Sequence, residues 1–129
     1  MKKYLAILTL VVAALSFNFT TIESNSVEAV MSWNLTAYDF GQIELNKPVT
    51  GEFEFQNTGS KPLYILSAQG SCGCTVAEYT RGEILPGEFG KVKATYNAAK
   101  VGVFSKTVTV NASTGEGPII LKIKGEVVQ

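Results

Sequence analysis

The chain has 129 residues, with 11 basic residues, 11 acidic residues and no histidine. Its formal net charge of zero argues against a nucleic-acid-binding protein, because such proteins usually carry a basic excess that neutralises phosphates. A chain without histidine cannot form a Ser-His-Asp or Cys-His catalytic group, so the main hydrolytic enzyme classes are disfavoured.

The first residues have the pattern of a secretory signal peptide. Lys2 and Lys3 precede an apolar run from Tyr4 to Leu15, which is shorter than the roughly 20 residues that a membrane-spanning helix needs. We therefore expect residues 1–29 to be a signal peptide with a short leader, and an uncut membrane anchor is the alternative. Residues 30–129 would then remain as one domain of roughly 100 residues.

Export to the periplasm or to the extracellular space follows from this prediction. The chain has no cysteine near the apolar run, so attachment as a bacterial lipoprotein is not expected. After cleavage of the signal peptide, no membrane span is expected in the mature domain.

From Trp33 onward the chain predicts short β-strands separated by turn residues. In residues 51–57 the rings of Phe53 and Phe55 alternate with charged or polar side chains. This period of two places the rings on a core and the polar side chains in water. Residues 57–60, Asn-Thr-Gly-Ser, then end the strand, since these residue types favour turns.

A continuous apolar run, residues 63–66, follows Pro62 and predicts a strand in the centre of a sheet. A tight turn is expected at residues 84–87, with Pro86 at its first corner and Gly87 at its second.

Three later segments alternate in the same way, at residues 91–96, 107–110 and 119–124. The residues expected to point inward are Val92, Ala94, Tyr96, Val108, Val110, Ile119, Leu121 and Ile123. Near the start of the domain, Trp33, Leu35 and Ala37 fit a first strand. Asp39-Phe40-Gly41 fits a turn that ends a strand, with Phe40 packed and Gly41 at the bend.

No segment after the signal peptide shows the spacing of an amphipathic helix. About seven short strands in roughly 100 residues are typical of an all-β fold, the immunoglobulin-like (Ig-like) β-sandwich, as a single domain. The chain lacks the widely spaced cysteine pair that joins the two sheets of antibody domains, so packing must hold its core.

Several motifs occur in a fixed order along the domain, and the most distinctive is Ser71-Cys72-Gly73-Cys74-Thr75. The others are residues 39–41, 55–65, 85–90, 102–110 and 121–127. Together they resemble domain-of-unknown-function family 1573, a family of short exported bacterial proteins. The resemblance implies an Ig-like sandwich, related in shape to major-sperm-protein and pilus-chaperone domains, and export from a bacterial cell. It implies no established activity.

Cys72 and Cys74 are the candidate site residues. They can form a disulfide, because residues i and i+2 of a strand share a face and Gly73 lets the backbone shorten the distance. So small a loop gains only about 1.6 kcal/mol in the chain-entropy model. The disulfide would therefore stabilise the fold only weakly, and its ease of reduction is the more interesting property.

Three roles for this pair remain open. The pair can be a disulfide, or a buried thiol pair, that shapes the loop beside the strand. It can exchange disulfides with a partner. Two thiolates can also hold Cu(I), whereas a structural zinc site normally needs four ligands and would have to take the others from carboxylates or from a partner.

The sequence favours an exported, non-enzymatic Ig-like module that binds protein or peptide at the cell envelope, through a sheet edge or a loop face. The expected partner is another envelope or secreted protein, and no cofactor is expected. The alternative is a thiol-exchange or copper-handling protein that uses Cys72 and Cys74.

Overall fold

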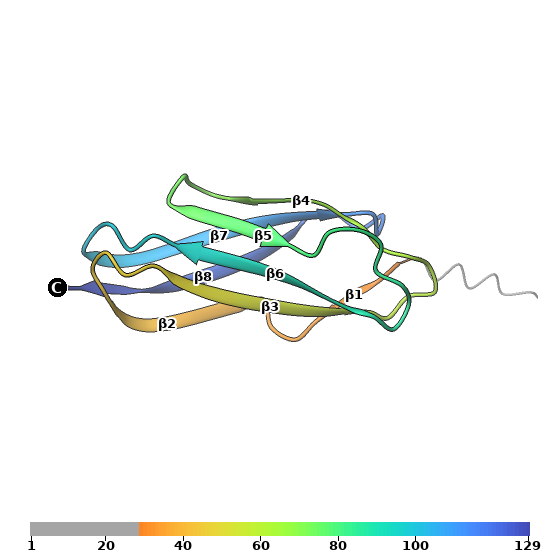
Figure 1. The fold of residues 1–129 in the computed structure, drawn as a ribbon, viewed down its shortest axis with the longest axis horizontal. Helices are drawn as coiled ribbons and strands as arrows, with labels where there is room; N and C mark the ends of the chain where they lie inside the picture. Colours follow the sequence, from red (N-terminus) through yellow and green to blue (C-terminus); the bar gives the residue numbers. More distant parts are fainter. Residues whose placement is uncertain (1–28) are drawn as a thin grey trace, which may run out of the picture.

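A computed structural model describes residues 29–129, which form two four-stranded β-sheets packed face to face (Figure 1). The predicted signal peptide, residues 1–29, lies outside the described residues except for Ala29. None of the described residues belongs to a helix that is long and apolar enough to cross a membrane. The all-β prediction is confirmed, and the described part of the chain has eight strands instead of about seven.

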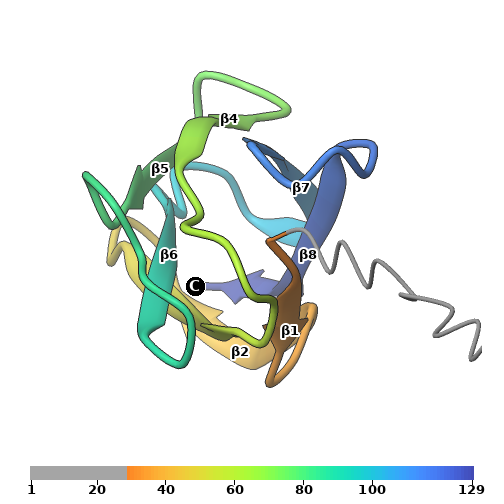
Figure 2. The same ribbon diagram turned by 90° about the vertical axis from the view of Figure 1, so that its right-hand side faces the viewer.

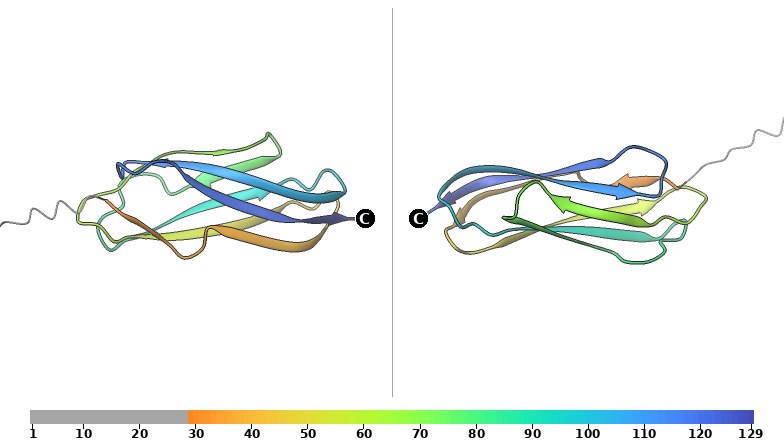
Figure 3. Two further views of the ribbon diagram at one scale, coloured as in Figure 1. Left: turned by 180° about the vertical axis from the view of Figure 1, so that it is seen from behind. Right: turned by 90° about the horizontal axis from the view of Figure 1, so that it is seen from above.

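The first sheet contains four antiparallel strands. In spatial order they are β1 (Met31–Trp33), β3 (Val49–Asn57), β6 (Phe89–Tyr96) and β5 (Thr75–Tyr79). The second sheet, seen from behind in Figure 3, contains β2 (Ala37–Glu44), β8 (Ile119–Val128), β7 (Gly102–Ala112) and β4 (Ile65–Gly70). Its strands are antiparallel except for β2, which runs parallel to β8.

The inward side chains of the first sheet follow the predicted alternation. Phe53 and Phe55 on β3 are buried, and so are Val92, Ala94 and Tyr96 on β6. Gly90 lies opposite Phe55 in the register of β3 and β6. A Cβ atom at Gly90 would lie 2.8 Å from Cδ1 of Ile84 and 2.9 Å from Cε1 of Phe55. The packed core therefore leaves no room for a side chain at this position.

The second sheet supplies the opposite half of the core. Val108, Val110, Leu121 and Ile123 are at most 1% exposed, as the alternation predicts. The rings of Tyr96 and Phe104 stack with centroids 4.0 Å apart, which joins β6 of the first sheet to β7 of the second.

The strand at residues 65–70 is an edge strand, so the prediction of a central strand is wrong. Among the strands of residues 29–129, its one ladder partner is β7. The apolar run alternates between the core and solvent, because Leu63 and Ile65 are buried while Tyr64 and Leu66 are 44% and 63% exposed.

Two predictions near the start of the domain are also corrected. Trp33, Leu35 and Ala37 do not share one strand, because the chain passes from the first sheet to the second between β1 and β2. Gly41 lies inside β2 and does not end it. The register with β8 shifts between Asp39 and Gln42, where Gly41 has φ +67° and donates its N–H to Oδ1 of Asp39 at 2.9 Å.

The predicted tight turn is confirmed. Its closing hydrogen bond runs from the N–H of Glu88 to the carbonyl of Leu85 at 2.9 Å, and Gly87 has φ +87°. This places Pro86 and Gly87 at the two corners of a type II turn, where the second corner requires positive φ.

Candidate functional site

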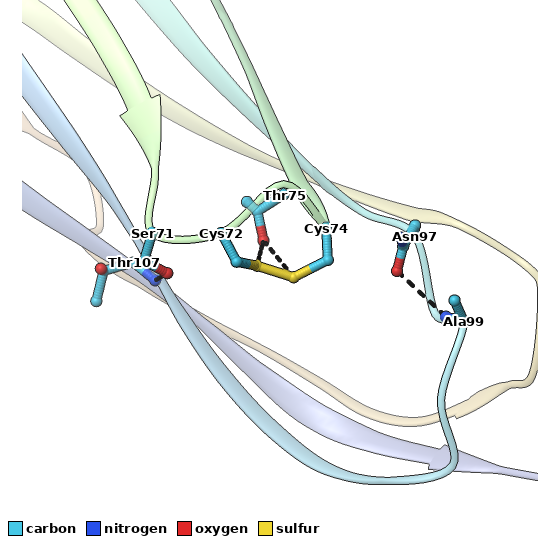
Figure 4. Close-up of a disulfide and its surroundings, with 7 residues drawn as sticks. All are labelled: Ser71, Cys72, Cys74, Thr75, Asn97, Ala99 and Thr107. Atoms are coloured by element: carbon cyan, nitrogen blue, oxygen red, sulfur yellow. Dashed lines mark hydrogen bonds between the residues drawn. A yellow bond between two sulfur atoms is a disulfide. The ribbon is translucent and has the colours of Figure 1, made fainter.

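Cys72 and Cys74 lie in the turn that connects β4 to β5, as Figure 4 shows. They form a disulfide with Cα atoms 5.2 Å apart, and both residues are partly exposed. Oγ1 of the buried Thr75 lies 3.7 Å from Sγ of Cys72 and 4.0 Å from Sγ of Cys74. The turn therefore presents one side of the disulfide to solvent and packs the other against the start of β5.

Main-chain hydrogen bonds attach this turn to both sheets. The N–H of Ser71 donates to the carbonyl of Thr107 on β7, and the N–H of Asn97 donates to the carbonyl of Cys74, at 2.9 and 3.0 Å. These bonds hold the turn independently of the disulfide.

Among the described residues, the side-chain hydrogen-bond partner of both sulfur atoms is Thr75, and no basic side chain donates to them. Arg81 contacts Tyr79, at the far end of β5 from Cys74. The described residues also contain no group of three or more Cys, Asp or Glu side chains placed to hold a metal ion.

A second feature begins at the same turn, and we call it the β4–β5 seam: the facing edges of Ile65–Gly70 and Thr75–Tyr79. These strands are the edges of different sheets on one side of the sandwich, opposite β1 and β2 (Figure 2). No ladder pair joins β4 to β5 within residues 29–129. Instead, the hydroxyl of Tyr79 crosses the seam and donates to the carbonyl of Leu66 at 3.5 Å.

The hydrogen bonds of the two sheets show which main-chain groups face the seam. On β5, Cys74 and Thr80 bond to the β6 side. Because bonding alternates along an antiparallel strand, the N–H and C=O of Ala77 then point away from β6. On β4, Ser71 bonds to β7, so the same alternation turns the main chain of Ala68 toward the seam.

The seam is closed at both ends. At the cysteine turn Gly70 lies against Thr75, so closely that a Cβ atom on Gly70 would lie 3.1 Å from Cβ of Thr75. At the other end Leu63 and Ile84 exchange two main-chain hydrogen bonds of 2.9 and 2.8 Å. The unpaired stretch between these two closed ends contains Ala68 and Ala77.

The sequence singled out the cysteine pair but missed the seam. The strand pattern around residues 65–79 does not distinguish a bonded hairpin from two strands that belong to different sheets.

Known structures share this fold at low sequence identity. A protein of unknown function from Porphyromonas gingivalis W83 has a TM-score of 0.68 and 20% identity over 78% of this chain. This chain spans about half (48%) of that one. The PapD-like domain 7 of human CEP192 has a TM-score of 0.62 and 12% identity, covering 79% of this chain and 87% of that domain.

A chain of the CsuC–CsuE chaperone–tip adhesion subunit complex from Acinetobacter baumannii is also similar. Its TM-score is 0.55 and its identity 13%, covering 77% of this chain and 57% of that one. No curated protein matches the sequence. A family model described as "Protein of unknown function (DUF1573)" matches residues 31–127, which is nearly all of the described part of the chain. The chain therefore belongs to the DUF1573 family, as its ordered motifs predicted.

Proposed function

We propose that this chain is an exported, non-enzymatic Ig-like module that binds a short extended segment of another envelope or secreted protein along the β4–β5 seam. The observation that carries the proposal is the missing ladder between two edge strands that run side by side. Edge strands with unpaired N–H and C=O groups are templates for an added strand.

The side chains of the seam also favour a guest segment. Gly70, Ala68 and Ala77 are small, so the side chains of an added segment would meet little obstruction. Val76 and Leu66 border the seam and are 59% and 63% exposed. Burial of such apolar surface would add to the main-chain hydrogen bonds.

The other described edges carry features that discourage strand addition. β1 has only three residues, and β2 is interrupted by the bulge at Gly41. Short edge strands and bulges are two of the ways in which proteins protect sheet edges. The edge strand β5 has neither feature, because it pairs with β6 in an uninterrupted register over its five residues.

The test replaces Ala77 by proline in the exported protein and uses the protein as bait for other exported proteins. Ala77→Pro removes an N–H that faces the seam and leaves the bonds of β5 to β6 in place. Loss of one such hydrogen bond should weaken capture of a specific partner by about tenfold.

Ala37→Pro is the matched control, because it removes an N–H on edge strand β2. The carbonyl of Thr36 bonds to β8, so the alternating groups of Ala37 face away from that neighbour. A partner lost with Ala77→Pro and retained with Ala37→Pro supports the proposal. A partner that binds the wild type and both variants equally contradicts it.

Thiol exchange is the second candidate function, and the partly exposed disulfide at the end of a turn favours it. In this reaction a partner thiolate attacks one sulfur, forms a mixed disulfide and releases the other cysteine as a thiolate. The reduced pair could instead bind Cu(I) through both sulfurs.

Redox titration with a mass readout separates this candidate from a structural disulfide. Thiol exchange predicts a reduction potential above about −300 mV, in the range of labile or catalytic disulfides. A pair that stays oxidised below that value contradicts thiol exchange. Titration of the reduced protein with Cu(I) tests copper binding, for which Cys72→Ser is the control.

A further inference from the structure

The side chain of Arg81 is fixed over the seam. Its Cζ atom lies 4.2 Å from the centroid of the Tyr79 ring, and Nη1 donates a hydrogen bond of 3.0 Å to the Tyr79 hydroxyl. That hydroxyl in turn donates to the carbonyl of Leu66 on the opposite strand. Stacking and hydrogen bonding together restrict the rotamers of Arg81, so less entropy is lost when its guanidinium binds a ligand.

The charge of Arg81 is not neutralised within the described residues. The ion pairs there belong to Lys47, Lys91, Lys93 and Lys124. A guanidinium has five N–H donors in a planar arrangement, and Tyr79 uses one of them. The remaining donors match the two oxygens of a carboxylate, which is the strongest common partner of arginine.

We infer that Arg81 anchors an aspartate or glutamate side chain of the segment that binds the β4–β5 seam. This inference rests on the proposed function and adds the chemistry of the partner. The closed ends of the seam favour a side chain over a chain terminus. A segment bound between Gly70 and the Leu63–Ile84 bridge must enter and leave the seam at the surface. The residue of that segment that lies near Arg81 is then an internal residue and not a terminus. The exposed Leu66 beside it favours an apolar neighbour.

The probes are two capped seven-residue peptides of alternating valine and threonine, with either glutamate or glutamine at the centre. Each is titrated into the 15N-labelled protein, and NMR follows the main-chain amides of Ala77 and Tyr79. The glutamate peptide should bind the wild type about tenfold more tightly than the glutamine peptide, because it forms a charge-assisted pair. Arg81→Gln should remove this difference, and Arg81→Lys should retain part of it.

Lys100→Gln is the matched control, because it removes one exposed positive charge outside the seam. It should preserve the preference for glutamate. If both peptides shift the seam amides with equal affinity, the carboxylate inference is overturned and the proposed strand addition stands. If neither peptide shifts these amides, strand addition at the seam is contradicted together with the inference.

Discussion

Asn57 shows how a single buried side chain organises one end of the sandwich. Its Nδ2 donates to the carbonyls of Lys61 and Ile84 at 2.8 and 3.0 Å, and its Oδ1 accepts from the N–H of Gly59 at 3.0 Å. The residue is fully buried at the end of β3. The sequence predicted the turn at Asn57 but not the bond to Ile84, which depends on tertiary contact.

Replacement of Asn57 by alanine should lower the free energy of unfolding by about 2–4 kcal/mol, since three hydrogen bonds are lost and buried groups remain unpaired. Urea unfolding followed by Trp33 fluorescence measures the change. The neighbouring Gln56→Ala removes one exposed side-chain bond to Gly87 and should cost less than about 1 kcal/mol. Equal losses in the two variants would contradict the role given to Asn57.

Individual strands were predictable to the extent that their side chains alternate. Alternation correctly assigned the inward residues of β3, β6, β7 and β8, because a strand with one buried face must repeat with a period of two. It failed for the position of β4, since a strand's place in a sheet depends on its neighbours. It also failed for Gly41, because a bulge and a turn favour the same residue types.

Removal of the disulfide in the cysteine turn tests whether this bond holds β4 and β5 in place. The double variant Cys72→Ser, Cys74→Ser should lose no more than about 1.6 kcal/mol of stability, because the closed loop is very short. The bonds from Ser71 to Thr107 and from Asn97 to Cys74 should persist, since they use the main chain.

Urea unfolding and circular dichroism of this double variant give the measurement. Oxidised wild-type protein is the reference, and reduced wild-type protein shows the effect of breaking the bond without substitution. Capture of a seam partner should survive in the double variant. A loss above about 3 kcal/mol would show that the disulfide is a main support of the fold.

The whole molecule is a sandwich whose two sheets meet through apolar rows and leave a gap in pairing on one side. The Tyr96–Phe104 stack and the buried valines of β6 and β7 hold the sheets together. The seam arises because β4 and β5 are consecutive in the chain but belong to different sheets. Ala68 pairs with Val110 and Ala77 with Ala94 inside their own sheets, but no ladder joins β4 to β5 within residues 29–129, and Tyr79 and Arg81 lie over that gap.

The sequence by itself determined the all-β class, the inward rows, the turn at Pro86 and Gly87, and the family, because these depend on local periodicity and ordered motifs. Only the tertiary structure decided which strands lie at edges, where the chain changes sheets and which backbone groups remain unpaired. Each of these depends on contacts between residues far apart in the chain, which a local sequence pattern does not determine.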